Sequence, residues 1–544
     1  MPDIIRRLPG ILIQWITPNL RDFWDTRQLK IWLVSLLIGV CVSVAAIMFR
    51  ELIGLFQWPW LRDMSENVAS AARATHWSVV LLAPAFGGLI VGLLLQHWLP
   101  PRRTGGIADV IEARALGGRN IDFKMGIKSS IVTALSLGAG ASAGREGPMV
   151  HLGATISTSI AASLRFPDWG RRTLLACGGA AAVSASFNAP IAGVLFAHEV
   201  ILGHYAMRSF VPIVISSVFG TLLPRMWFGD VAAWSVPEYN ITSYFEFPAF
   251  ALLGLTCALV AVLFQFALIS SDYIARNITM PLWLRPAIGG LLIGAIALYY
   301  PEVLGVGYEA TDKALKNELP LTLLLALLIA KTIATAITLA SRFGGGIVAP
   351  SLYLGAMAGG AFGLIAAKFL PEMASSQGLY SILGMGAVAA AVIGAPISTT
   401  VMVFELTGGY TLSIALLLVV SIAAGINQAI HGRSYFQWQL ESRGLVVQNG
   451  PHRYLVRNTR VERFMAPLAE GETPEPHNPE KDPPAMKPSD TLEHALRMFD
   501  QGGHARLPVI DPNQPDRIIG WATQVAALRH FNRALIDVSE EEHR

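Results

Sequence analysis

Arg145 and Glu146 are the two residues whose position in this sequence most needs a chemical explanation. They stand side by side in the segment Gly144–Ala154, between long apolar sequences. Charged side chains inside a membrane are costly and by default mark the path of an ion or a substrate. Gly147 and Pro148 follow them, and this combination is typical of a tight turn that leads into a helix.

A turn of this kind predicts a binding site for an anion. Its free N–H groups point outward, and the positive end of the helix dipole lies at the same place. Such a site holds an anion without a full counter-charge, so the ion can leave again. The Glu146 carboxylate would then be a tethered anion that blocks the path when ionised and swings away when protonated or displaced. The alternative is a structural pair of Arg145 and Glu146 at a helix cap.

Two pairs of segments recur in the same order, which indicates an internal duplication. Gly144–Ala154 matches Gly346–Ala356 at an offset of 202 residues, and Phe187–Glu199 matches Ile393–Glu405 at an offset of 206. The second loop also has a proline in the matching position, Pro350. Repeated halves with a binding site between them are typical of membrane transporters. The alternative is that Ala-Pro and Gly-Ala pairs recur by chance in a sequence rich in alanine and glycine.

The composition excludes several other classes of protein. Of the 544 residues, 53% are hydrophobic and 15% are charged, whereas soluble proteins have about 25% charged residues. The net charge of +3 gives no indication of nucleic-acid binding. Cys41, Cys177 and Cys257 lie in apolar segments with a spacing that suits neither a metal site nor a disulfide framework. We therefore expect a membrane protein without metal or cofactor.

The elements that position the charged pair are apolar helices of unequal length. Crossing the hydrocarbon takes about 20 helical residues, and helices that are too short must be buried in protein or line a water-filled cavity. The expected spans are Ile31–Phe49, Val79–Leu95, Ala249–Ile269, Ala287–Tyr300, Leu321–Leu339 and Thr411–Ala424. The expected shorter apolar pieces are Gly126–Ala141, Met149–Ala162, Thr173–Val183, Ile191–Leu202 and Leu383–Ile393.

The distribution of basic residues predicts the orientation in the membrane. Lys and Arg gather before the first span, in the loop 102–128 and after the last span, whereas Phe228–Phe247 contains none. The side rich in Lys and Arg faces the cytoplasm. We therefore expect a multi-pass protein of the inner (plasma) membrane with both termini in the cytoplasm.

Three motifs resemble the CLC chloride channels and chloride/proton antiporters. They are GREGP at Gly144–Pro148, GGIVAP at Gly345–Pro350, and Tyr435 after the last span. The resemblance covers about Ile31–Gln439. It implies an all-α polytopic membrane protein with two inverted-topology repeats of tilted and broken helices. It also implies a homodimer in which each subunit has its own anion path.

The resemblance also implies roles for individual residues. Glu146 corresponds to the gate of the family, and the backbone around Gly147 and the second loop corresponds to the part that holds chloride. Tyr435 would contact the central anion from the cytoplasmic side, although a tyrosine after a span is also an ordinary residue of the membrane interface. The residues assigned to chloride binding are Gly105, Arg145, Gly147, Ile347, Val348 and Tyr435.

Departures from the family pattern concern the inner anion site and proton coupling. The first anion loop is TGGIAD, Thr104–Asp109, so Gly105 stands where the family commonly has a serine hydroxyl. Glu199 is followed by Val200, where the antiporters have a second glutamate that relays protons. This favours a gated channel. The alternative is an antiporter that uses His198 or Glu199 as its proton relay.

Other motifs in the membrane part give weaker indications of function. His198-Glu199 with His204 resembles the motif of intramembrane zinc proteases, but the two histidines are six residues apart rather than four and fall on different helix faces. The glycines of Gly138–Gly144 have the wrong spacing for a dinucleotide site and suit close helix packing. Glu199 and Glu405 occupy equivalent repeat positions and are expected to be structural partners of backbone groups or of an arginine.

The last part of the chain has a different composition and predicts a soluble domain. We expect a helix with a capping box of Asp490 and Glu493, strands at Arg506–Asp511 and Arg517–Thr523, and a helix at Gln524–Leu535. The order β-α-β-β-α resembles a CBS domain, of which one copy fits, so it would pair across the dimer. Nucleotide-binding CBS domains carry Thr/Ser-x-x-Asp, but here Thr523 is followed by Ala526, which argues against nucleotide binding.

Together these features predict the following organisation and function. The expected domains are a cytoplasmic N-terminal segment (1–30), a CLC-type transport domain (31–439, with halves of about 31–225 and 248–439), a connector (440–460) and a small α+β CBS-like cytosolic domain (461–544, with a Pro-rich extended insert at 467–488). The expected function is chloride transport, with the lipid bilayer, chloride, a second copy and, for an antiporter, protons as partners. We expect no enzymatic activity. A membrane-anchored CBS sensor without transport is the remaining alternative.

Overall fold

The structure, a computed structural model, describes residues 16–17, 21, 24, 27–116, 118–229, 234, 239, 241–369, 371, 374–407, 412–445, 456, 459–468, 476–478 and 482–543. The chain folds into two compact units, Met1–Tyr435 and Phe436–Arg544. Most of the expected N-terminal segment 1–30 and part of the connector 440–460 lie outside the described residues.

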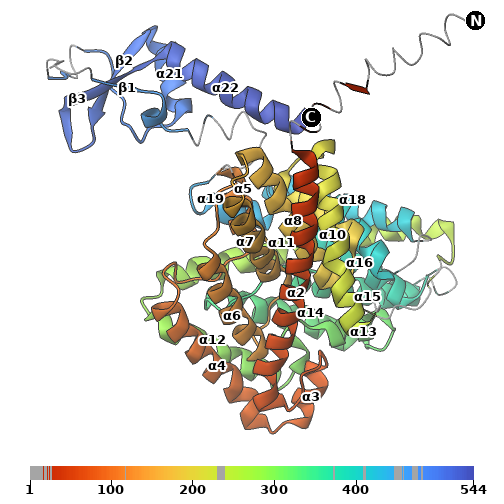
Figure 1. Ribbon diagram of the computed structural model, residues 1–544. Coiled ribbons are helices and arrows are strands. Elements are labelled where there is room, and N and C mark those ends of the chain that lie inside the picture. The colour runs from red at the N-terminus through yellow and green to blue at the C-terminus, as the bar shows by residue number, and fades with distance from the viewer. Residues whose placement is uncertain are drawn as a thin grey trace, which may run out of the picture. The chain divides into compact units, whose positions relative to one another are not determined.

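The first unit contains the long apolar helices that the composition predicts (Figure 1). Within the described residues, seven helices are long and apolar enough to cross a membrane. They are α2 (Gln28–Leu61), α4 (Trp77–His97), α10 (Met207–Phe228), α11 (Phe247–Asn277), α14 (Leu321–Ala340), α15 (Val348–Phe369) and the stretch Ser413–Glu441, formed by α18 (Ser413–His431) and α19 (Tyr435–Glu441). Five of the six expected spans are confirmed by these helices.

Three differences from the expected spans are found. The helix α15 was expected only as an apolar helical run after Pro350, and it is long enough to span. The expected span at Ala287–Tyr300 is wrong, because α12 (Arg285–Ala297) has only 13 residues. The helix α10 was not expected, because Pro212 and Pro224 lie inside it and Arg208 and Arg225 lie near its ends. These residues reduce its hydropathy, yet the helix is long enough to span.

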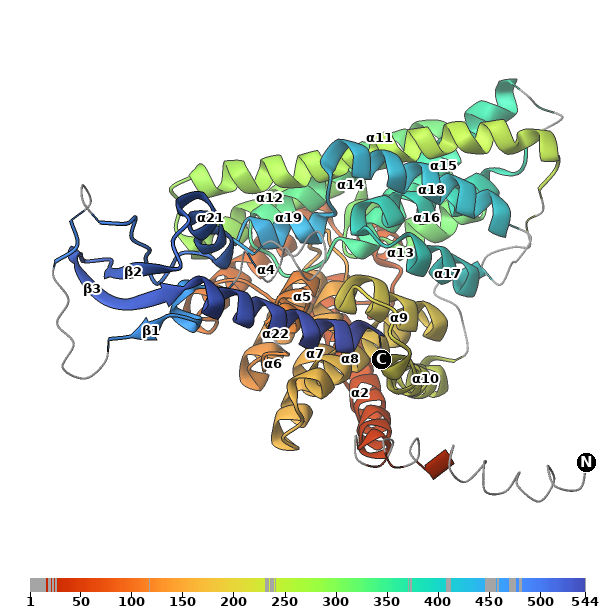
Figure 2. The same ribbon diagram turned by 90° about the horizontal axis from the view of Figure 1, so that it is seen from above.

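Shorter helices complete the first unit. They are α3 (Val68–Ala74), α5 (Ile107–Ala115), α6 (Phe123–Gly138), α7 (Glu146–Ser163), α8 (Asp168–Phe187), α9 (Pro190–Phe196), a π-helical turn (Ala197–Leu202), α13 (Tyr308–Leu315), α16 (Gln377–Ile393) and α17 (Pro396–Thr407). All residues of α16 are buried. Seen from above in Figure 2, the helices of the first half, up to α10, and those of the second half, α11 to α18, form two adjoining layers.

The two halves use the same close helix packing. A Cβ atom added to Gly153 of α7 would lie 2.3 Å from the carbonyl oxygen of Gly178 on α8, and one added to Gly355 of α15 would lie 2.2 Å from that of Gly384 on α16. These glycines occupy equivalent repeat positions. Backbone-to-backbone contact of this kind leaves no room for a side chain, and small residues at such crossings are typical of membrane helices. The duplication seen in the sequence is therefore also present in the packing.

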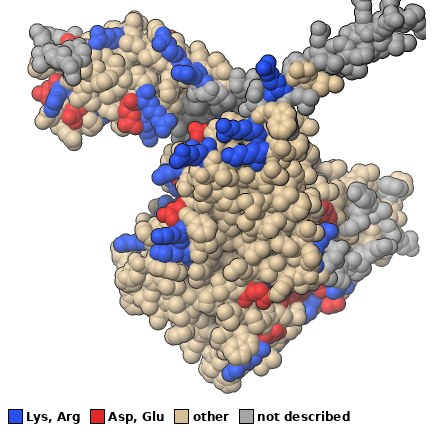
Figure 3. All heavy atoms as spheres, viewed as in Figure 1, with Lys and Arg blue, Asp and Glu red and all other residues tan. Residues whose placement is uncertain are grey.

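Charged side chains are distributed unevenly on the surface. In Figure 3, lysines and arginines gather at the end of the first unit where α2 begins, and a broad area without charged residues follows on the face shown. Many large apolar side chains of the spanning helices are exposed, for example Leu33, Met48 and Phe266, which are 61%, 66% and 63% exposed. An exposed apolar belt of this extent is what a lipid bilayer covers.

The second unit is a small α+β fold. Its sheet has the order β1–β3–β2 and is antiparallel throughout. The elements are β1 (Ala466–Pro467), α21 (Leu492–Gly502), β2 (Arg506–Asp511), β3 (Gln514–Thr523) and α22 (Gln524–His543). The helices bury apolar side chains against the sheet, and the core contains Leu492, Phe499, Leu507, Val509 and Ala522.

Two details of this unit differ from the expectation. The side chain that caps α21 is Thr491, whose hydroxyl accepts a hydrogen bond from the His494 amide, whereas the Asp490 carboxylate accepts from the Lys487 amide. Part of the Pro-rich segment 467–488 belongs to the fold, because Met486 is fully buried and pairs in parallel with Val509 of β2. The side chain of Met486 adds apolar contact to a small core, which explains why this part of the Pro-rich segment belongs to the fold.

Candidate anion site

The two repeat loops meet at their equivalent glycines. Gly144 and Gly346 form an antiparallel pair in which each amide donates to the carbonyl oxygen of the other, both at 2.7 Å. An antiparallel pair of equivalent residues means that a local two-fold axis relates the two loops. Gly147 lies against Gly346, since a Cβ atom added to Gly147 would be 3.4 Å from the Gly346 Cα atom. A Cβ atom added to Gly346 would lie 3.2 Å from the Gly147 amide nitrogen, which is tighter than ordinary contact, so the glycine at 346 suits this close approach.

Two helices start from this pair of loops. The helix α7 begins at Glu146 and α15 begins at Val348, so both start two residues after their paired glycine. The prolines Pro148 and Pro350 are the third residues of these helices, rather than the first as expected from helix statistics. The first turn of a helix leaves its N–H groups without partners in the helix, so a proline is tolerated anywhere in it.

The N–H groups in front of these prolines have no partner in their own helix. The first hydrogen bonds of the two helices run from Met149 to the Arg145 carbonyl oxygen, at 3.1 Å, and from Ser351 to the Ile347 carbonyl oxygen, at 2.9 Å. The amides of Gly147 and Ala349 come before these first bonds in the chain, so they have no acceptor within their own helix. Two facing helix starts with such amides have the geometry and the dipole direction that favour an anion.

Glu146 places its carboxylate at this site. The side chain is 1% exposed. A Cβ atom added to Gly144 would lie 2.5 Å from Glu146 Oε2 and 3.1 Å from the Ala349 amide nitrogen, so both atoms lie on the same side of Gly144. The other oxygen, Oε1, accepts a hydrogen bond of 2.7 Å from the Tyr308 hydroxyl. The carboxylate thus lies beside the start of α15, held by a neutral donor.

Arg145 points to a different set of partners. Its guanidinium donates to Glu66, lies 4.9 Å from the centroid of the Tyr308 ring, and is 10% exposed. Glu66 also pairs with the Arg50 Nε atom at 3.1 Å. Burial raises the pKa of Glu66, but the positive charges of Arg145 and Arg50 outweigh this effect and lower it overall. Arg145 is therefore balanced by Glu66 rather than by Glu146.

Two cavities open next to this cluster. One of about 320 Å³ is lined by Arg50, Glu66, Arg145 and Tyr308 among others, and one of about 470 Å³ by Glu66, Tyr308, Glu309 and Lys313 among others. Glu66 and Tyr308 belong to the walls of both. The helix α3 nearby lies at the end of the unit opposite to the start of α2 (Figure 1). Tyr308 thus separates these cavities from the Glu146 carboxylate.

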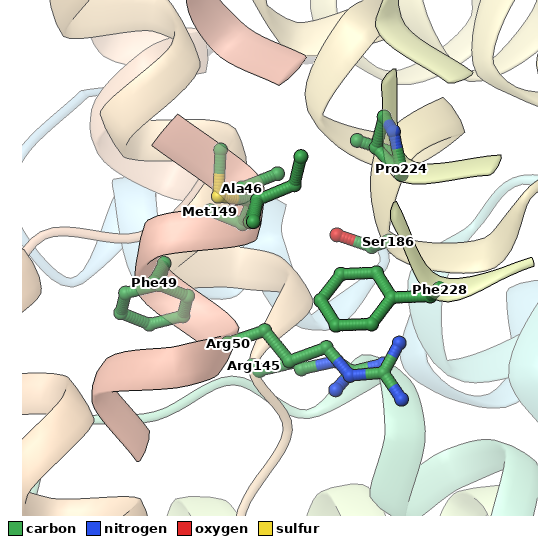
Figure 4. Close-up of a pocket in the computed structure, with 10 residues that line it drawn as sticks. Ala46, Phe49, Arg50, Arg145, Met149, Ser186, Pro224 and Phe228 are labelled. Atoms are coloured by element: carbon green, nitrogen blue, oxygen red, sulfur yellow. The ribbon is translucent and has the colours of Figure 1, made fainter. Parts of the chain in front are cut away.

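A much smaller cavity also borders Arg50 and Arg145. Figure 4 shows the two arginine side chains next to each other, with the ring of Phe228 close to Arg50. The Arg50 guanidinium lies 4.0 Å from the centroid of that ring. The cavity has a volume of about 20 Å³, enough for about one water molecule. Ser186 contributes a hydroxyl to its wall.

The remaining residues assigned to chloride binding are buried as well. Ile347 and Val348, at the start of α15, are 2% and 3% exposed. Tyr435 begins α19 and is 5% exposed. The Gly105 amide donates to the Ser129 hydroxyl at 2.8 Å. Gly105 therefore brings neither a side chain nor its own N–H group to an anion.

Glu199 and Glu405 form a reciprocal pair of helix caps. The Glu405 carboxylate accepts from the amides of Ile191 and Ala192, at 2.9 and 2.7 Å, at the start of α9. The Glu199 carboxylate accepts from the amides of Ile397 and Ser398, at 3.0 and 2.7 Å, at the start of α17. Each half thus supplies the carboxylate that caps a helix of the other half. Both glutamates are structural partners of backbone groups.

His198 is packed beside this pair. It is 1% exposed, its Nδ1 atom lies 3.0 Å from the His204 carbonyl oxygen, and its ring stacks on Tyr205 with centroids 5.6 Å apart. His204 follows Gly203, which has a positive φ of 73° and ends the π-helical turn. The two histidines therefore do not share one helix face. Within the described residues there is no group of three or more possible metal ligands.

Sequence reasoning missed Tyr308, Glu66 and His151. Glu66 lies in the loop between α2 and α3, and Tyr308 is the first residue of α13, so only the folded chain brings them to Arg145 and Glu146. His151 was visible in the segment after Glu146, and its ring lies against Gly105. The sequence feature that could have pointed to His151 is Gly105, a glycine at a position where the family commonly has a serine.

The fold defines a helical membrane protein with two repeated halves whose helix starts face each other, and comparison with known proteins identifies its family. A family model described as "Voltage gated chloride channel" matches residues 87–428, and one described as "CBS domain" matches residues 479–533. The chain belongs to this family, the CLC proteins, and carries a C-terminal CBS domain.

Individual relatives agree with this assignment. The chain is 33% identical over 389 residues to a ClcB-like chloride channel protein of Ralstonia nicotianae, covering 70% of this chain and 90% of that protein. It is 30% identical over 412 residues to the voltage-gated ClC-type chloride channel ClcB of Escherichia coli, covering 74% and 97%. The fold is similar to that of a slow cyanobacterial Cl⁻/H⁺ antiporter, with a TM-score of 0.69, 23% identity, and 77% and 99% of the two chains covered.

Proposed function

We propose that this protein transports chloride across the membrane through a path between the starts of α7 and α15, with Glu146 as the gate. The observation that carries the proposal is the position of the Glu146 carboxylate beside the Gly144–Gly346 pair and the Ala349 amide. An anionic side chain at two facing helix starts competes with a dissolved anion for the same N–H groups. Membership of the CLC family supports chloride as that anion.

Gated conduction without proton coupling is the mode that we propose first. Proton coupling needs a second group that carries protons between the gate and the cytoplasm. Val200 cannot ionise, and the neighbouring Glu199 carboxylate is engaged by two backbone N–H groups. Both relatives described above are named as channels. These features support a chloride channel.

Chloride/proton antiport is the second candidate. It is favoured by the structural similarity to an antiporter. In this case His198 or Glu199 would relay protons. His198 is the better placed of the two to change its protonation, because Glu199 would have to give up its backbone partners at the start of α17.

Proton movement in chloride-loaded proteoliposomes distinguishes these modes. An outward chloride gradient is imposed, potassium and valinomycin hold the membrane potential near zero, and external pH is followed. Chloride efflux without proton movement supports the channel. Sustained uphill proton uptake that is lost in Glu146→Gln supports the antiporter. Absence of any flux would refute both and favour a membrane-anchored sensor that signals through its CBS domain.

The assembly and orientation are part of the proposal. We propose a homodimer in an inner (plasma) membrane, with both termini in the cytoplasm and the CBS domains paired across the dimer. The Thr523 hydroxyl accepts a hydrogen bond from the Ala526 amide at 3.2 Å and so caps α22. A hydroxyl used in this way, without an acidic residue at position 526, supports a structural role for the tail rather than nucleotide sensing.

A further inference from the structure

The space that a side chain would fill at position 105 is occupied by His151. A Cβ atom added to Gly105 would lie 2.3 Å from His151 Nε2, 2.4 Å from Cε1 and 2.5 Å from Cδ2. These distances are far below van der Waals contact, so a side chain at 105 would require the imidazole of His151 to move from its present place. His151 therefore takes the place that the serine of other family members would use.

The two glycine amides of the loop at Gly105 are already engaged. The Gly105 amide is bound to the Ser129 hydroxyl, and the Gly106 amide donates to Asp109 Oδ2, both at 2.8 Å. Asp109 in turn pairs with Arg103. A buried anion needs donors, and these two amides supply none, so a side chain that reaches Gly105 from another element can provide one.

His151 has the polarity and the burial that such a donor needs. The residue is 7% exposed, and its Nδ1 atom has no hydrogen-bond partner within the described residues. Buried polar atoms without a partner are uncommon in native structures, and each needs an explanation, of which a bound ion is one. A neutral imidazole has one N–H donor. The ring thus has hydrogen-bonding capacity that the described part of the chain does not use.

His151 lies further along the same helix as the gate residue Glu146. It lies on α7, five residues after Glu146, which corresponds to about 7.5 Å along the helix axis. The start of α5 bridges the two places, because Ile107 comes within 4.0 Å of the Cβ position of Gly147 while Gly105 lies against the imidazole. One loop therefore touches both the backbone anion site and His151.

We infer that the imidazole of His151 is a side-chain donor to the transported anion and replaces a serine hydroxyl at position 105. The inference rests on the proposed function, since it concerns the same anion path. The pair Gly105 and His151 forms one unit: the glycine leaves the space, and the histidine brings the N–H group. An imidazole is a larger donor than a hydroxyl, so this unit also sets which anions fit.

Chloride binding to the purified full-length protein, measured by calorimetry, tests the inference. His151→Leu keeps a similar volume without a donor and should weaken chloride binding at least tenfold, as expected for a lost hydrogen bond to a charged partner. His151→Gln keeps an N–H donor and should stay within about threefold of the wild type. His97→Leu, a change of an exposed histidine at the end of α4, is the matched control and should change nothing.

A rescue experiment separates the donor from a packing role. His151→Ala empties the space, and the double variant Gly105→Ser with His151→Ala puts a serine hydroxyl into it. The double variant should bind chloride at least fivefold more tightly than His151→Ala, whereas Gly105→Ser alone should clash with the ring. This comparison also decides the matter if His151→Leu does not fold.

The outcomes distinguish this inference from the proposed function. Wild-type binding and flux together with unchanged chloride binding in His151→Leu would overturn the inference alone. Failure of the double variant to bind more tightly than His151→Ala would also overturn it. Absence of chloride binding and flux in the wild type would refute the proposed function and this inference with it.

Discussion

The hydroxyl of Tyr308 is the donor that holds the Glu146 carboxylate, so its removal should open the gate. In Tyr308→Phe the hydrogen bond of 2.7 Å to Glu146 Oε1 is lost. The aromatic ring that lies under the Arg145 guanidinium remains. The change therefore affects the gate and leaves the neighbouring ion pair of Arg145 and Glu66 in place.

The expected magnitude follows from the charge of the acceptor. A hydrogen bond to a charged group contributes about 1.5–3 kcal/mol, which corresponds to about a 10- to 150-fold shift between the held and the released carboxylate. We expect chloride efflux from proteoliposomes at neutral pH to rise about tenfold or more. The rise is limited by the flux of a fully open path, which Glu146→Gln provides as a reference.

Tyr353→Phe is the matched control. Tyr353 is a buried tyrosine on α15, and its hydroxyl has no hydrogen-bond partner within the described residues. Its removal should leave chloride efflux unchanged within about twofold. Equal efflux from Tyr308→Phe and the wild type would refute the reasoning, and so would an equal rise in both tyrosine variants.

Three further predictions concern stability and the geometry of the site. Gly144→Ala should prevent folding or displace the gate, because the new Cβ atom would lie 2.5 Å from Glu146 Oε2. In the control Gly425→Ala the new Cβ atom meets nothing within 4 Å, so this variant should be neutral or stabilising by up to about 1 kcal/mol. Expression levels and size-exclusion profiles of the two variants test this difference. Glu199→Gln and Glu405→Gln should each lower the free energy of unfolding by about 1–2 kcal/mol and by similar amounts, because each carboxylate caps the start of the equivalent helix in the other half. Thermal unfolding that shows an effect for only one of the two glutamates contradicts the reciprocal arrangement. Neighbouring arginines lower the pKa of Glu66 below its ordinary value of 4.5, so the ion pairs of Glu66 stabilise the fold above pH 4.5 and lose this stabilisation as the pH falls further. The difference in free energy of unfolding between the wild type and Glu66→Gln should therefore shrink on acidification. A difference that stays constant with pH contradicts the prediction.

The part of the site that lies close together in sequence could be predicted well. The facing helix starts were predicted because glycine, proline and Leu-Gly-Ala recur at a fixed offset, and these residue types have local conformational meaning. The reciprocal roles of Glu199 and Glu405 were also predicted in kind, since equivalent positions in two repeats face equivalent partners. The partner itself, the start of a helix in the other half, depends on how the halves pack.

Residues that reach the site through tertiary packing could not be found. Glu66 lies in a short loop and Tyr308 begins α13, and neither stands in a sequence motif. Their role depends on the distance to Arg145 and Glu146 in the folded chain. The contact of His151 with Gly105 depends on the packing of α5 against α7. The unexpected span α10 shows the same limit for helices, because prolines and arginines reduce local hydropathy without ending the helix.

The most direct test of the central claim is chloride efflux from proteoliposomes containing Glu146→Gln, measured between pH 4.5 and 7.5 beside the wild type. Glutamine keeps the size of the side chain but cannot carry the charge that competes with chloride at the two helix starts. We predict high efflux that does not depend on pH in the variant and pH-dependent efflux in the wild type. Wild-type pH dependence in the variant, or efflux no faster than from empty liposomes, would contradict the assignment of Glu146 as the gate of an anion path.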